Sequence, residues 1–192
     1  MLRIMCCRSL NKNKSLEISK ARHSETKVVL LGDSGVGKSS ILLRYTQDEF
    51  SEDFEVTIGG AYMQTQVWLE DRTPVTLDVW DTAGQERYKS LLHLYYRKAS
   101  AAIIVFDVGS SESFGQCEYW VKTLKEHEPE CLLFLVGNKA DLHNWEVDSE
   151  AAEDFAAKNK MQWIETSAKI GKNVPDLFKK VAEAINSKRL NL

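Results

Sequence analysis

A glycine-rich segment near the start of the chain, residues 32–39, has the residue types and spacing needed to hold a phosphate group. It reads GDSGVGKS and matches the pattern G-x-x-x-x-G-K-S/T. Glycines let backbone N–H groups approach a phosphate closely, and the helix that follows adds the positive end of its dipole. The ammonium of Lys38 can neutralise the outer phosphates, and the hydroxyl of Ser39 can bind Mg²⁺. The four fixed positions match by chance in roughly one chain of this length in a hundred, so the segment predicts a nucleotide phosphate site.

A second segment, NKAD at residues 138–141, has the chemistry to recognise a guanine base. The carboxylate of Asp141 can accept from both the ring N–H and the exocyclic amine of guanine, whereas adenine offers no matching pair of donors. Asn138 can tie strands and loops around the base, and the stem of Lys139 can cover the ring face. By itself N-K-x-D is a common turn composition. Its place after an apolar run, downstream of a phosphate loop, favours guanine recognition.

Two further positions complete the predicted site. Asp81 ends the apolar run Val75–Trp80, where a carboxylate is needed to hold hydrated Mg²⁺. An aspartate at a strand end is more often a turn residue, but the phosphate loop upstream favours the metal role. In the segment SAK at 167–169, the backbone N–H of Ala168 can donate to the guanine oxygen.

Alternating strands and helices are expected to position these groups. Apolar and β-branched runs predict strands at 27–31, 60–69, 75–81, 101–107, 132–137 and 162–165. Helices are predicted after the phosphate loop to about residue 47, near 88–98, from Ser111 to about Glu126, from a Ser149 cap to about Lys158, and from an Asn173 cap onward with Pro175 in its first turn. This order predicts an α/β fold with a mostly parallel six-stranded sheet, helices on both faces and an early hairpin at 71–74 as an antiparallel edge. Ligands of such sheets bind beyond the carboxyl ends of the strands, where all the groups above are placed.

Length and composition indicate one globular domain. The chain has 192 residues, 43% of them hydrophobic, and a net charge of −3. We expect a flexible basic extension at 1–25, one domain at 26–187 and a short tail at 188–192. The acidic body argues against nucleic-acid binding. Cys117 and Cys131 are expected to be reduced thiols, and without an evident secretory signal the expected compartment is the cytosol.

Taken together, the ordered motifs resemble the Rab branch of the Ras-like small GTPases, which are built on the P-loop NTPase small G domain. The strings GDSGVGKSS, WDTAGQERY, GNKAD and ETSAK, with Thr57, carry this resemblance over roughly residues 25–187. The strings TIGGAY at 57–62 and YYR at 95–97 are most similar to the early-endosomal subgroup. The resemblance therefore implies a GTP-binding and GTP-hydrolysing switch of vesicle traffic, on the cytoplasmic face of endosomal membranes.

The resemblance also implies residue roles. Thr57 would bind Mg²⁺ and sense the γ-phosphate, Gly84 would present its N–H to that phosphate, and Phe50 would pack against the base. Gln85 would orient the attacking water, so that Gln85 and Lys38 are the candidate catalytic residues. The nucleotide contacts would come from Ser34, Gly35, Val36, Gly37, Lys38, Ser39, Ser40, Phe50, Thr57, Gly84, Asn138, Lys139, Asp141, Ser167, Ala168 and Lys169. The Mg²⁺ ligands, direct or through water, would come from Ser39, Thr57 and Asp81.

The implied partners follow from the same family. Tyr62, in place of the family's usual phenylalanine, would form with Trp80 and Tyr95 an aromatic triad read by effectors, although ordinary packing also accounts for such side chains. An exchange factor and a GTPase-activating protein are expected, the latter because no arginine stands out as an internal finger. The protein is expected to be a monomer. The chain ends KRLNL without cysteines to prenylate, so a lipid anchor is expected instead at Cys6 and Cys7; the alternative, equally open, is an unmodified leader on a chain whose lipidated tail has been cut off.

Two alternatives to a hydrolysing switch remain at this point. A nucleotide-loaded binding module that barely hydrolyses is disfavoured by the presence of Gln85. An ATP-using kinase is disfavoured by Asn138 and Asp141 and by the absence of an arginine cluster typical of a lid.

Overall fold

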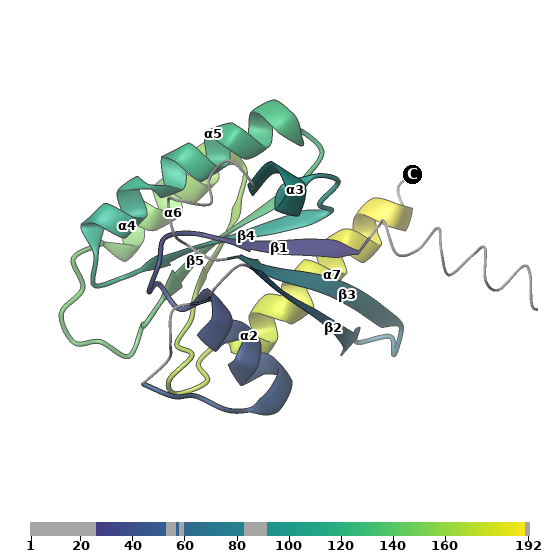
Figure 1. Ribbon diagram of the computed structural model, residues 1–192, viewed down its shortest axis with the longest axis horizontal. Coiled ribbons are helices and arrows are strands. Elements are labelled where there is room, and N and C mark those ends of the chain that lie inside the picture. Colours follow the sequence, from purple (N-terminus) through teal and green to yellow (C-terminus); the bar gives the residue numbers. More distant parts are fainter. Residues whose placement is uncertain (1–25, 53–56, 58–59, 83–91, 191–192) are drawn as a thin grey trace, which may run out of the picture.

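One sheet organises the protein in the computed structural model, which describes residues 26–52, 57, 60–82 and 92–190 (Figure 1). Its strands are β1 (Lys27–Leu31), β2 (Gly60–Trp68), β3 (Pro74–Thr82), β4 (Ala101–Asp107), β5 (Leu132–Asn138) and β6 (Gln162–Glu165). Across these described ranges the strand order is β2-β3-β1-β4-β5-β6. β2 pairs antiparallel with β3, and every other pairing between the described strands is parallel. The predicted six-stranded, mostly parallel sheet with one antiparallel edge is therefore confirmed.

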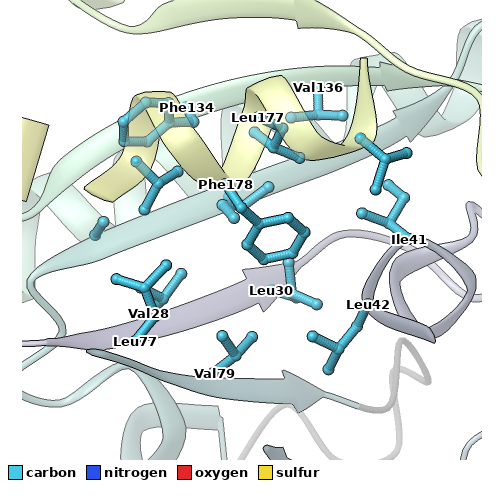
Figure 2. Close-up of a cluster of buried hydrophobic side chains, with 14 of the residues drawn as sticks. Val28, Leu30, Ile41, Leu42, Leu77, Val79, Phe134, Val136, Leu177 and Phe178 are labelled. Atoms are coloured by element: carbon cyan, nitrogen blue, oxygen red, sulfur yellow. The ribbon is translucent and has the colours of Figure 1, made fainter. Parts of the chain in front are cut away.

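Helices cover both faces of the sheet, as the alternating pattern predicts (Figure 1). They are α2 (Lys38–Gln47), α3 (Leu92–Tyr96), α4 (Ser111–Gly115), α5 (Cys117–His127), α6 (Ser149–Asn159) and α7 (Val174–Leu190). Successive residues of β1 point to opposite faces, so Val28 and Leu30 join a core with α2 and α7, while Val29 and Leu31 join a core with α5 and α6. Figure 2 shows the first of these cores, where Phe178 of α7 lies over Leu30. Burial on both faces explains why the central strands are apolar throughout.

The helix predicted from residue 111 to about 126 is wrong in its continuity. The chain instead forms α4 and α5, which meet at Gln116. The cap is Ser110, whose hydroxyl accepts from the backbone N–H of Ser113 at 3.2 Å. The Ser113 side chain in turn accepts from the N–H of Asp107, so the first turn is fixed to the end of β4.

Two boundaries nearer the carboxyl end also differ from expectation, the start of α6 and the end of α7. α6 is capped by Asp148, which accepts from the N–H of Glu150, and not by Ser149, whose hydroxyl donates to Glu165. α7 begins directly after Asn173, as predicted; the Asn173 carbonyl accepts from the N–H of Leu177, and its side-chain amide donates to the carbonyl of Glu165. α7 also continues to residue 190, so the start of the expected tail is helical.

Several expectations fall on residues outside the description. The extension at 1–25 and the first part of the helix predicted near 88–98 are among them, and α3 is the described remainder of that helix.

Cys117 and Cys131 are free thiols, and burial raises the pKa of each to about 12. No helix among the described residues is long and apolar enough to cross a membrane.

Candidate functional site

The phosphate loop joins β1 to α2 and contains two glycines, Gly32 and Gly37, at positions where any side chain would clash. Gly32 has φ of 138°, and a Cβ on it would lie 2.1 Å from the carbonyl oxygen of Val105. Gly37 has φ of 96°, and a Cβ on it would lie 2.3 Å from Nδ2 of Asn138. Side chains at these positions would therefore clash with β4 and with the predicted base-recognition segment. The loop is packed tightly against both.

Lys38 is the first residue of α2 and its side chain folds back over this loop. Its Nζ donates to the carbonyl oxygens of Gly32 at 2.8 Å and Asp33 at 2.6 Å, and the residue is 5% exposed. Burial lowers the pKa of Lys38 to about 8, while the carboxylates of Asp81 and Asp33 oppose that shift. The charged form is thus costly in the folded chain, and an anionic phosphate beside Nζ would raise the pKa again. The arrangement suits a lysine that binds phosphate.

Oxygen atoms gather beside Lys38 in a cluster suited to a hard cation. The hydroxyl of Ser39 lies 2.8 Å from that of Thr57 and donates to Oδ2 of Asp81 at 2.5 Å. Asp81 is 2% exposed, and its Oδ1 has no hydrogen-bond partner among the described residues. Burial raises the pKa of Asp81, against the opposing effects of Ser39 and Lys38. A buried, unpaired carboxylate oxygen is costly, and Mg²⁺ prefers oxygen ligands, so these three residues fit that ion.

Asn138, the last residue of β5, connects the base-recognition segment to the phosphate loop. Its Nδ2 donates to the carbonyl of Val36 at 2.9 Å, and the residue is 2% exposed. Its Oδ1 accepts from the hydroxyl of Thr166 and from the N–H of Ala168, each at 3.2 Å. The N–H that sequence reasoning assigns to the guanine oxygen is therefore engaged within the protein, by a long bond that the base would have to share or replace.

The remaining base-recognition side chains are held by neighbours. Oδ1 of Asp141 accepts from the hydroxyl of Ser167 at 2.5 Å. Lys139 has a left-handed φ of 65°, and its Nζ lies 2.6 Å from Oδ2 of Asp107. Asp107 was not among the predicted site residues, although an aspartate at the carboxyl end of an apolar strand is a signal that could have found it. It fixes the lysine stem over the place predicted for the base.

A cavity of about 430 Å³ joins these parts. It is lined by Ser34, Gly35, Gly37, Lys38, Ser39, Ser40, Phe50, Ser51, Glu52, Thr57, Thr82, Asn138, Lys139, Asp141, Leu142, Ala168 and Lys169. Val36, Asp81 and Ser167 lie behind this lining and hold it through the hydrogen bonds given above. Sequence reasoning missed Ser51, Glu52, Thr82 and Leu142 in the lining. Gly84 and Gln85 lie outside the described residues.

The three aromatic side chains predicted to face effectors are neighbours. The ring centroids of Tyr62 and Trp80 are 5.2 Å apart, and those of Trp80 and Tyr95 are 6.3 Å apart. Tyr62 is 50% exposed, and its hydroxyl donates to the buried Asp78 at 2.8 Å. The Tyr95 ring also explains why residue 60 is a glycine, because a Cβ at that position would lie 2.7 Å from Tyr95.

Comparison with known protein families matches this chain to the Ras family over residues 27–187. The chain belongs to the Ras family. Curated relatives include "Ras-related protein Rab-5B" of Plasmodium falciparum, 42% identical over 88% of this chain and 81% of the relative. "GTP-binding protein ypt5" of Schizosaccharomyces pombe is 44% identical over 83% and 77%, and "Ras-related protein RABF2a" of Arabidopsis thaliana is 45% identical over 85% and 82%.

These findings confirm the predicted small G domain and the resemblance to the Rab branch, with its early-endosomal subgroup. This Ras-family protein is accordingly a small GTPase, a class of enzyme that hydrolyses GTP to GDP. Proteins of the Rab branch are GTP-binding switches in vesicle trafficking, and they work with effectors, exchange factors, GTPase-activating proteins and membranes.

Proposed function

We propose that this Ras-family GTPase is a Mg²⁺-dependent, GTP-hydrolysing switch of endosomal traffic, on the cytoplasmic face of the endosomal membrane. The observation that carries the proposal is that Asp141 and Lys38 line one and the same cavity. The unpaired Oδ1 of Asp81 supports the metal requirement. The similarity to the early-endosomal subgroup supports the compartment.

The proposed reaction needs little covalent chemistry from the protein. Asp141 and the N–H of Ala168 orient the base, and Lys38 with the N–H groups of the phosphate loop holds the β- and γ-phosphates. Gln85 positions a water in line with the γ-phosphorus, and attack by that water breaks the bond to the bridging oxygen, giving GDP and phosphate. Mg²⁺, held by Ser39 and Thr57 and through Asp81, would supply positive charge as the bridging bond breaks.

The same proposal assigns the partners. Tyr62, Trp80 and Tyr95 form the surface that effectors contact, because the rings are adjacent and Tyr62 is half exposed. Loss of the γ-phosphate would release residues 48–60 and 84–95. The reason is that Thr57, whose hydroxyl lies beside that of Ser39, would lose the phosphate that holds it in place. An exchange factor replaces GDP, and a GTPase-activating protein supplies the arginine that the site lacks among its predicted residues. The protein acts as a monomer.

Single-turnover hydrolysis separates the proposed switch from a nucleotide-loaded module. Protein preloaded with GTP and mixed with Mg²⁺ is expected to convert the bound nucleotide slowly to GDP, within hours, as in GTPases without an internal arginine finger. Chelation of Mg²⁺ is expected to release the nucleotide faster. Bound GTP that stays intact for days with Mg²⁺, at full occupancy of the site, contradicts the hydrolytic proposal and supports the binding module.

Membrane attachment is proposed at Cys6 and Cys7, which lie outside the described residues. They stand beside Arg3 and Arg8 in a basic stretch, and thioester-linked acyl chains would contribute about 0.8 kcal/mol per buried CH₂. Fractionation of the full chain from its own cells is expected to place the wild type with membranes and the Cys6→Ser/Cys7→Ser variant in the supernatant. A matched Cys117→Ser/Cys131→Ser variant should stay with membranes. A double Cys6/Cys7 variant that remains membrane-bound refutes the assignment.

A further inference from the structure

Arg44, near the end of α2, makes four hydrogen bonds, two of which link this helix to a distant segment of the chain. Its Nε donates to the carbonyl of Ala168 at 2.8 Å and its Nη2 to the carbonyl of Lys169 at 2.9 Å. Its Nη1 donates to the carbonyl and to Oδ1 of Asp48, at 2.8 and 2.9 Å. The Arg44 side chain is 18% exposed. One largely buried guanidinium therefore uses two of its nitrogens, Nε and Nη2, on the main chain of residues 168–169.

These two carbonyls belong to the segment that faces the base. Ala168 and Lys169 both line the cavity, and the N–H of Ala168 points to Oδ1 of Asn138. The next turn is close as well, because a Cβ on Gly171 would lie 3.8 Å from Cδ of Arg44. Backbone position here decides where the Ala168 N–H lies, since a backbone donor has no side-chain rotamer with which to adjust. A guanidinium fork on the neighbouring carbonyls fixes that position.

We infer that Arg44 is a positioning residue for guanine recognition, which holds the backbone of residues 168–169 so that the Ala168 N–H is placed for the guanine oxygen. This rests on the proposed use of Ala168 in base binding. Arg44 is not among the residues that line the cavity, and its contacts with residues 168–169 are to backbone carbonyls. With this role for Arg44, α2 would serve both parts of the nucleotide site. Lys38 at the start of the helix would bind phosphate, and Arg44 in its last turn would position the segment that faces the base.

Arginine suits this role better than lysine. The two carbonyls are reached by two different nitrogens of one rigid plane, whereas an ammonium is a single point with no fork. Hydrogen bonds from a charged donor contribute more than neutral ones, so the loss of both is expected to be measurable as at least tenfold in binding. Arg44→Lys should therefore rescue only part of what Arg44→Ala loses.

The test compares GDP with 2-aminopurine riboside 5′-diphosphate, which keeps the guanine amine but lacks both the oxygen and the ring N–H. The lost contact of that N–H with Asp141 is common to the wild type and the Arg44 variants, so it cancels when the preference for GDP is compared between them. The dissociation constants of both are measured for the purified full chain with Mg²⁺. In Arg44→Ala the preference for GDP over the analogue is expected to fall about tenfold, while the affinity for the analogue changes less than about twofold. Arg44→Lys is expected to be intermediate. The control is Asp48→Asn, which removes the charge of the other partner, keeps an oxygen acceptor and tolerates the left-handed φ of 56°.

Each outcome decides the inference. Equal losses for GDP and the analogue would mean that Arg44 supports the fold in general, and unchanged affinities would mean that it supports nothing in the site; both overturn it. If Arg44→Ala does not fold, the ratio in Arg44→Lys decides in the same way. A wild type that binds GDP no better than ADP would instead refute the proposed function itself, so the two failures are distinguishable.

Discussion

Asp141→Asn is expected to weaken GDP and GTP binding by roughly 10⁴ and to move the preference to xanthine nucleotides. The carboxylate of Asp141 accepts from two donors of guanine, and an asparagine would turn one N–H toward the guanine amine. Xanthine carries an oxygen where guanine has that amine, so it can accept from the new N–H. The bond from Ser167 to Oδ1 holds the side chain in place and remains available to an amide oxygen.

Competition binding against a fluorescent guanine nucleotide measures this exchange of preference. The matched control is Asp154→Asn, the same chemical change at an exposed position of α6, and it should bind GDP like the wild type. Two results would contradict the assignment of Asp141. One is a variant that keeps its preference for GDP over xanthosine diphosphate, and the other is a wild type that binds ATP as well as GTP.

Gln85→Leu is expected to keep GTP binding and to lose about 10³-fold or more of the hydrolysis stimulated by a GTPase-activating protein. Leucine has similar bulk but offers neither a donor nor an acceptor to the attacking water. Gln85 itself lies outside the described residues, and the prediction rests on its place in WDTAGQERY, four positions after Asp81. Single-turnover rates with and without the activating protein measure the effect.

The control for Gln85 is Gln162→Leu, the same change at an exposed position of β6. It should be stimulated like the wild type. A Gln85→Leu variant that hydrolyses GTP at the stimulated wild-type rate would show that another group orients the water, and the catalytic assignment would be withdrawn.

The parts of the site that the sequence predicts are those in which one local segment does the chemistry. The phosphate loop is such a part, because its glycines, Lys38 and the flanking elements are contiguous. The base-recognition segment is another, because NKAD follows directly on a buried strand. Residues of both segments, among them Lys38 and Asp141, line one cavity, and their binding of a nucleotide stays a prediction.

What the sequence did not predict depends on long-range contacts or on close competition between neighbours. Arg44 reaches Ala168 over 124 positions, and no local pattern signals that pairing. At the start of α6, Asp148 and Ser149 are both good capping residues, and the attraction of Glu165 for the serine hydroxyl leaves the cap to the aspartate. Where two neighbouring residues are equally good caps, contacts with distant residues decide which of them caps the helix.

The central place of β1 bears on how the protein is made. Of the strands in the described ranges, β1 is the first to leave the ribosome, yet it lies between β3 and β4, pairing at Lys27 with Asp78 and at Val28 with Ala101. The strand neighbours that hold β1 and its phosphate loop in place are therefore complete only after β4 has been synthesised. The predicted base pocket is complete only after the segment that follows β6 has been synthesised. We expect a nascent chain to retain no nucleotide until translation of the domain is almost finished. Binding of GTP or GDP is then expected to be one of the last events of biogenesis, and only chains with a fully synthesised domain would carry nucleotide.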